Sequence, residues 1–311
     1  MMDLSDLKEL QKDVIRKSRR INVIFILIWI LTMITIYYKN LIQLFSYNIY
    51  LFDTAIVLIL ATMVRHIILN KKIKLFENEF KKIFVLSSLS QIFEKLNYLP
   101  DKGLNEEVIS NTKMMNMGDL YSSNDYFEAE YKGIRVKQAD VTIEEKRETT
   151  DSNGHTQTHY INIFRGKWMI FDFNKTFNFN IQVCQKEFTN SKIPYWGEQK
   201  NYQKVTMEDE EFNKMFSVYA QDAHEAFYIL TPQFMEKIKK LVSNIKGTIL
   251  LCFIDHELHI GLDNNEDSFE YDIYKPIEEG KIKEKLISEI KVITDFIEEL
   301  NLDDNLFRRE V

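Results

Sequence analysis

The sequence predicts an α+β protein in which a two-helix transmembrane hairpin is followed by a cytoplasmic domain with a mainly antiparallel sheet and packed helices. Three observations indicate this fold class. Two long apolar runs stand near the N-terminus, a period of two begins near residue 126, and the last third combines capped helices with a short hairpin. These patterns are typical of membrane helices, strands and amphipathic helices, respectively.

The first apolar run, residues 21–38, is 18 residues long. This length suits a helix that crosses a hydrocarbon core about 30 Å thick. The second run, about 49–69, contains Asp53 and Arg65 around a shorter apolar stretch. Because charges inside a bilayer are costly, we expect both at the membrane faces, unless Asp53 is a buried functional carboxylate. A cleaved signal peptide or two buried helices of a soluble core are the alternatives.

Apart from Arg65, the lysines and arginines of this region lie outside both apolar runs, and the segment between the runs carries only Lys39. They precede the first run and follow the second: Lys8, Lys12, Arg16, Lys17, Arg19, Arg20, Lys71, Lys72, Lys74, Lys81 and Lys82. Positively charged flanks stay on the cytoplasmic side of a membrane. The sequence therefore predicts a two-span protein of the cytoplasmic membrane with both termini in the cytoplasm.

Charge differs between the N-terminal part and the rest of the chain. Residues 1–82 contain 13 Lys and Arg against 7 Asp and Glu, and since the whole chain carries −7, the remainder carries −13. An acidic body is repelled by phosphate, which argues against nucleic acid as a partner. Basic flanks favour an anionic leaflet, so the lipid bilayer is the first expected partner. Two cysteines, Cys184 and Cys252, indicate no disulfide framework.

Four segments are predicted along the chain. They are an amphipathic cytoplasmic segment over 1–20, the transmembrane hairpin over 21–70, a stalk helix over 71–100 that ends at Pro100, and a cytoplasmic α+β domain over 101–311. The N-terminal segment either packs antiparallel against the stalk or forms one amphipathic helix on the body.

The first half of the body has segments of period two separated by turn residues, which predict strands. They are a hairpin over 126–147 that turns at Lys132-Gly133, a turn at Asn153-Gly154, strands over 159–175 bent at Gly166, a strand over 178–187 and a surface loop over 188–207.

The sequence of the second half of the body predicts several helices and one β-hairpin. Asp222 and Thr231 are suitable N-caps, and Pro232 suits the first helical position. The predicted elements are helices over 208–216, after Asp222 and from Thr231 to Gly247, a hairpin over 248–262 turning at Asp255-His256, a strand over 268–274 and a helix over 277–300.

Four stretches together resemble a known family: LNYLPDKGL, SSNDYFEAEYKGIRVKQADV, FRGKWMIFDFNKTF and DAHEAFYILTPQFMEKIKKL. They are similar to the domain of unknown function 3137 family of bacterial membrane-anchored proteins, over most of residues 75–275. The family positions are filled by Tyr98, Pro100, Asp125, Phe164, Gly166, Asp172 to Lys175, Ala226 and Leu230 to Pro232. The first hairpin departs from the pattern, with Ala129 or Glu130 in place of Gly. The resemblance implies the fold and membrane placement, but no activity or cofactor.

Two clusters are candidates for ligand chemistry. Cys252, His256 and His259 are residue types that bind metal ions, although a solvated turn beside a buried cysteine explains them equally. Asp172, Asn174 and Lys175 place a carboxylate, an amide and an amine at a strand end, where a polar ligand or an ordinary turn would use them.

No phosphate-binding loop, nucleophile elbow or kinase motif occurs in the chain, and we expect no cofactor. The sequence therefore favours a protein-interaction or scaffold module at the inner face of the cytoplasmic membrane, with an unidentified protein partner and a homo-oligomer left open. One alternative is a membrane-tethered metal-dependent hydrolase that uses the Cys252–His259 hairpin. Another is a membrane sensor or transport accessory protein that reads the bilayer through Asp53.

Overall fold

The computed structural model describes the chain except for residues 1, 42–47, 151–155, 173–176, 189–200 and 301–311. The chain divides into two compact units. The first unit comprises Met1–Val85 and Glu270–Ile282, and the second comprises Leu86–Phe269 and Lys283–Val311. The α+β fold class is confirmed, because two long apolar helices precede a nine-stranded antiparallel sheet with helices.

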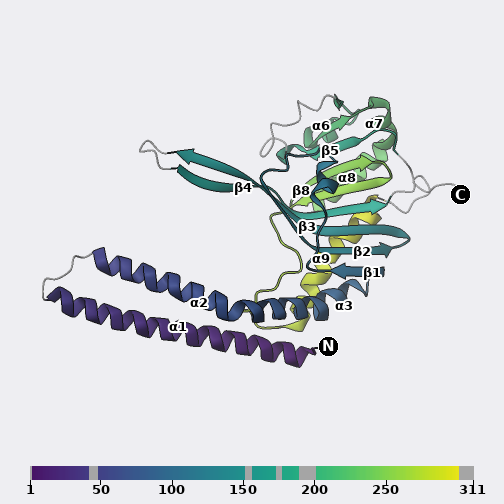
Figure 1. Cartoon of the computed structure of the whole chain (residues 1–311). Coiled ribbons are helices and arrows are strands. Elements are labelled where there is room, and N and C mark those ends of the chain that lie inside the picture. Colours follow the sequence, from purple (N-terminus) through teal and green to yellow (C-terminus); the bar gives the residue numbers. More distant parts are fainter. Residues whose placement is uncertain (1, 42–47, 151–155, 173–176, 189–200, 301–311) are drawn as a thin grey trace. The chain divides into compact units, whose positions relative to one another are not determined.

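Two long helices form the first unit: α1 (Leu4–Leu41) and α2 (Asn48–Phe80), which continues into the π-helical turn η1 (Lys81–Val85). Figure 1 shows α1 and α2 side by side. Both are long and apolar enough to cross a membrane.

The N-terminal half of α1 packs on α2, as in the first of the two predicted arrangements. Leu7 and Val14 of α1 are fully buried, as is Leu69 of α2. The Asp13 carboxylate forms an ion pair with the Lys72 ammonium. An apolar seam with an ion pair at its margin therefore joins the two helices.

The predicted stalk helix is wrong in its last part. Helix α3 (Leu86–Leu89) ends early, and β1 (Glu94–Leu99) forms a strand that pairs antiparallel with the next strand of the sheet. The Phe93 and Phe127 rings lie 5.4 Å apart. The apolar residues before Pro100 have helical spacing in the sequence, but they belong to β1 and the turn before it, where Phe93 packs on the sheet.

The second unit is built on one sheet with the strand order β1-β2-β3-β4-β9-β8-β5-β7-β6. Its remaining strands are β2 (Leu120–Tyr131), β3 (Ile134–Thr150), β4 (Thr156–Asp172), β5 (Ile181–Gln185), β6 (Gln203–Val205), β7 (Phe216–Ala220), β8 (Thr248–Ile254) and β9 (Glu257–Asp263). The predicted turns are present at Lys132-Gly133 and at Asp255, where φ is positive. The predicted turn at Asn153-Gly154 lies outside the described residues.

Helices α4 (Glu106–Ser110), α6 (Glu210–Met215), α7 (Ala223–Ile229) and α8 (Pro232–Asn244) belong to the second unit, as does most of α9 (Glu279–Leu300). The two predicted caps are confirmed. Asp222 accepts hydrogen bonds from the backbone of α7, and Thr231 accepts one from Phe234 N at 3.3 Å. Both caps satisfy backbone donors that the first helical turn leaves unpaired.

Three further predictions for the body need correction. The predicted helix over 208–216 ends at Met215, and β7 follows it. The predicted loop over 188–207 contains the short strand β6. Residues 268–274 are not a strand, because the backbone N–H groups of Ser268 and Phe269 donate to the side chains of Asp140 and Glu289 and not to a neighbouring strand.

The sheet buries both faces. One face carries Trp168, Cys252 and Leu250, which pack with Ile109 and Met114 of the segment before β2. Helices cover the opposite face: Phe234 of α8 lies 6.0 Å from the Phe253 ring. Polar side chains that point inward from either face are therefore removed from water and need hydrogen-bond partners within the protein.

Candidate functional site

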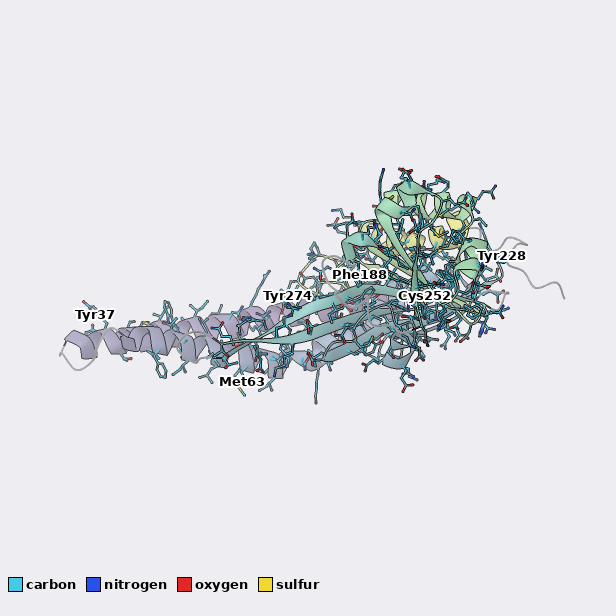
Figure 2. All side chains as sticks on the ribbon, turned by 90° about the horizontal axis from the view of Figure 1, so that it is seen from above. Tyr37, Met63, Phe188, Tyr228, Cys252 and Tyr274 are labelled. Atoms are coloured by element: carbon cyan, nitrogen blue, oxygen red, sulfur yellow. The ribbon has the colours of Figure 1, made fainter. Side chains whose placement is uncertain are left out.

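The α1/α2 hairpin presents a belt of exposed apolar side chains, which we call the apolar belt. It comprises Val23, Ile24, Ile26, Leu27, Ile28, Trp29, Ile30, Leu31, Ile34, Phe52, Ile56, Leu58, Ile59, Leu60, Met63, Ile67 and Ile68. Figure 2 shows Tyr37 near one end of the two helices and Met63 along them. Contiguous exposed apolar surface of this extent is unusual on a water-soluble monomer.

Arg65 lies on α2 in a specific contact with the return segment of the first unit. Its Nη2 donates to the Tyr274 hydroxyl at 2.6 Å, and its guanidinium carbon lies 5.2 Å from the centre of the Tyr274 ring. A guanidinium held by a hydroxyl and an aromatic face is partly shielded. Asp53 lies within α2, but its side chain is outside the described residues.

The return segment is fixed to α1 by one buried amide. Gln11 Nε2 donates to the carbonyl oxygens of Ile273 and Lys275 at 2.8 and 2.6 Å. Lys81 adds an ion pair with Glu270 at 2.7 Å. These contacts order an irregular segment that pairs with no strand in the described part of the chain.

The candidate ligand-binding set at the end of β4 is only partly described. The Asp172 carboxylate lies 3.8 Å from His256 Nε2 and 3.8 Å from Arg135 Nη1. Asn174 and Lys175 lie outside the described residues. The structure thus brings together Asp172 and His256, which the sequence assigned to two different candidate sites.

Two of the three candidate metal ligands face each other across a strand pair. Cys252 of β8 lies directly opposite His259 of β9, and both are buried. Burial raises the pKa of the Cys252 thiol. His256 lies in the exposed turn, and the described residues do not place its ring nitrogens with the other two ligand atoms in one metal-sized group.

Both His259 ring nitrogens already have partners. The Trp168 indole Nε1, which can only donate, lies 3.3 Å from His259 Nδ1. Nδ1 is therefore an acceptor, and Nε2 donates to Glu257 Oε2 at 3.3 Å. This arrangement fixes the ring between an indole and a carboxylate.

Glu257 connects His259 to a second cation. Its other oxygen accepts a hydrogen bond from Lys137 Nζ at 2.9 Å. The hydrogen bond from His259 and the interactions with Lys137 lower the pKa of Glu257 to about 2. The row Trp168, His259, Glu257 and Lys137 is a chain of satisfied polar contacts across three strands.

A feature that sequence reasoning missed is the extension of β3 and β4 beyond the sheet. β2 pairs with β3 only as far as Glu144, and β4 meets β9 first at Gly166. Residues 145–150 and 156–161 pair with each other alone among the described residues, and we call this extension the ribbon. Figure 1 shows it projecting from the sheet. The apolar alternation of β3 ends at Ile143, and the charged residues that follow it were a signal for where the sheet stops.

Residues 162–302 match the model of the family described as protein of unknown function (DUF3137). This segment, slightly less than half of the chain, supports the resemblance to the DUF3137 family. The match covers the third and fourth of the stretches that carried the resemblance, whereas the first two lie before it.

The other comparisons add little to this assignment. A crystal structure of the mycobacterial trehalose monomycolate transport factor A, TtfA, is 8% identical, with a TM-score of 0.37, over 73% of this chain and 94% of that chain. At this level the comparison carries neither fold nor function. No curated protein matches the chain.

The DUF3137 match spans most of β4, the strands β5 to β9 and the helices α6 to α9. It therefore includes the Trp168–His259–Glu257 row and the end of β4. The apolar belt lies outside the matched residues, so the family match says nothing about it.

Proposed function

We propose that this chain is anchored in a membrane by α1 and α2 and that its α+β body acts as a protein-interaction module on the cytoplasmic side. The observation that carries the anchoring is the apolar belt. Core helices of a soluble protein are mostly buried, whereas the apolar windows of α1 and α2 are 6% and 11% buried. Exposed Leu, Ile and Val on two paired helices are what lipid tails solvate.

The charge pattern supports the orientation. Both basic clusters lie where the proposed spans enter the cytoplasm, and the body carries the chain's excess of acidic residues. Basic flanks bind the anionic inner leaflet, and an acidic body is repelled from it. The body would therefore be held near the membrane and kept available to a partner.

The ribbon supports the interaction role. Its β3 side carries charged residues in mutual ion pairs, including Lys146 with Glu148 at 2.7 Å. Its β4 side carries uncharged residues and one histidine, with Tyr160 exposed. Charges protect a strand edge from pairing, and the β4 edge lacks them. This edge suits a partner that adds a strand through backbone hydrogen bonds.

The hydrolase alternative has less support. A catalytic metal needs ligands with free lone pairs and a position open to water. His259 uses both ring nitrogens in hydrogen bonds, and Cys252 is buried within the sheet core. No observation favours the sensor alternative through Asp53.

Photo-crosslinking in intact membranes tests the interaction role. A photoreactive amino acid replaces Tyr160 on the ribbon or, as a matched control, the exposed Tyr228 on α7. We expect one reproducible crosslinked protein from position 160 and not from position 228. Equal background from both positions, or no product from either, would contradict the interaction role and leave the anchoring to be judged by fractionation.

A further inference from the structure

Three carboxylates from distant parts of the second unit converge at one edge of the sheet's interior. They are Asp125 of β2, Asp140 of β3 and Asp267, which follows β9. One oxygen from each lies within 4.8 Å of the others. Asp125 and Asp140 are buried, and Asp267 is exposed, so the group is open to solvent on one side.

A β-bulge places Asp125 in the group. The β2–β3 register shifts between Asn124 and Phe127, and Asp125 has a φ of 54°. Tyr98 Oη and Asn124 Nδ2 donate to the two oxygens of the Asp125 carboxylate. The bulge turns this carboxylate toward Asp140, which lies in the adjoining strand.

The group also contains buried polar atoms without partners. Asp140 is 3% exposed and Ser268 is 2% exposed. Within the described residues, Asp140 Oδ1 and Ser268 Oγ complete no hydrogen bond. The backbone N–H of Ser268 donates to the other oxygen of the Asp140 carboxyl, which holds Ser268 beside the group. Burial raises the pKa of Asp140 to about 8, and the nearby Ser268 hydroxyl opposes this rise only in part. Buried oxygens left unpaired are costly, and a bound ion would satisfy them.

Lys167 is the basic residue paired with Asp140 in the sheet, and it has other partners. Lys167 lies opposite Asp140 in the β3–β4 register. Its Nζ donates to the carbonyl oxygen of Glu289 at 3.3 Å and lies 5.4 Å from the centre of the Phe269 ring. No ion pair joins Lys167 to Asp140 among the described residues. Arg165 Nη2 lies 3.9 Å from the Asp267 carboxylate. The three carboxyl groups therefore outnumber the two basic side chains, Arg165 and Lys167, that lie beside them.

We propose that Asp125, Asp140 and Asp267, with the Ser268 hydroxyl, bind one hard divalent cation, Ca²⁺ or Mg²⁺. Carboxylate and hydroxyl oxygens are the ligands that these ions prefer, and the softer transition metals would favour nitrogen or sulfur. The bound ion would join β2, β3 and the loop after β9. It should therefore stabilise the folded second unit and leave the ribbon unaffected.

Calorimetry on the metal-free full chain in detergent tests the site, with CaCl₂ and MgCl₂ titrated separately. We expect one equivalent of at least one ion to bind per chain and to raise the melting temperature. Asp267→Asn should weaken that binding at least about tenfold, by loss of a direct ligand. Asp267 is exposed, so this variant keeps the fold.

Glu210→Gln on α6 is the matched control, because it removes one exposed acidic charge away from the group. It should bind the ion as wild type does. Three results would overturn the proposal: no binding of either ion, wild-type affinity in Asp267→Asn, or equal weakening by Glu210→Gln, which would indicate general attraction to an acidic body.

Discussion

Aliphatic side chains have opposite surroundings in the two units. On the α1/α2 hairpin, Leu31 is 63% exposed and Ile59 is 64% exposed, whereas Leu250 and Leu251 of the sheet are fully buried. In Figure 2, Cys252 lies within the body of the second unit, and Met63 lies on a helix of the first. The same residue types therefore meet two different environments.

The apolar side chains of the two units are therefore shielded from water in different ways. Strands and helices on both faces supply the second unit with its own apolar partners. In the first unit, α1 and α2 bury one seam against each other and leave the remaining apolar surface uncovered. Each Å² of such surface costs about 25 cal/mol in water, so an external apolar phase would stabilise the first unit alone.

The largest expected effect comes from removing a core aromatic. Trp168 is fully buried, donates to His259 and covers Gly261 opposite it. Trp168→Ala should lower the free energy of unfolding of the body by about 4 kcal/mol, through lost contacts and a cavity. Urea unfolding in detergent measures it. Trp29→Ala on α1 is the matched control and should leave this transition unchanged; equal effects would erase the contrast between the units.

A charge in the apolar belt should impair insertion. Leu27 is exposed in α1, and Leu27→Arg near a span centre should cost about 3 kcal/mol of insertion free energy. The fraction of protein in washed membranes measures the change. An arginine in place of the exposed Tyr228 on α7 should leave that fraction as it was. Unaltered partitioning of Leu27→Arg would count against lipid around α1.

The polar row of the sheet should make stability depend on acid pH. The hydrogen bond from His259 and the contact with Lys137 lower the pKa of Glu257 to about 2. Because the folded pKa is below the unfolded value of about 4.3, this stabilisation is present above that pH and is lost as pH falls toward 2.

Each unit of lowering corresponds to about 1.4 kcal/mol, so we expect a loss of about 1 to 3 kcal/mol across this window. Urea midpoints at a series of pH values measure the loss, and Glu257→Gln should flatten the curve. If the urea midpoint of the wild-type chain did not change between about pH 4 and pH 2, the lowered pKa of Glu257 would contribute nothing to stability.

Elements with local signals were predicted correctly from the sequence. Asp222 and Thr231 cap their helices through contacts with the next few residues, and the turns at Lys132-Gly133 and Asp255 need only positive φ. The strands β1 and β7 were not predicted, because they form through pairing with segments distant in the sequence. A short segment becomes a strand when a partner edge pairs with it, and no single-segment pattern records that partner.

The candidate sites show the same limit. Cys252 and His259 are close in sequence and lie opposite each other, but their hydrogen bonds to distant residues could not be read from spacing. Asp125, Asp140 and Asp267 come from three separate segments, so their convergence needs the register of β2 and β3. No single-strand signal marked Asp140, because it stands among Lys137, Gln138 and Thr142 of β3.

The proposal that lipid surrounds the first unit, whereas the second unit buries its own apolar side chains, is tested most directly by extracting membranes with alkaline carbonate. This treatment removes peripheral proteins and leaves spanning ones. We expect the full chain to remain in the pellet and to enter solution only with detergent. A chain lacking residues 1–85, and so lacking both proposed spans, is the control and should enter the carbonate supernatant. Recovery of the full chain in the carbonate supernatant would contradict the proposal that lipid surrounds α1 and α2.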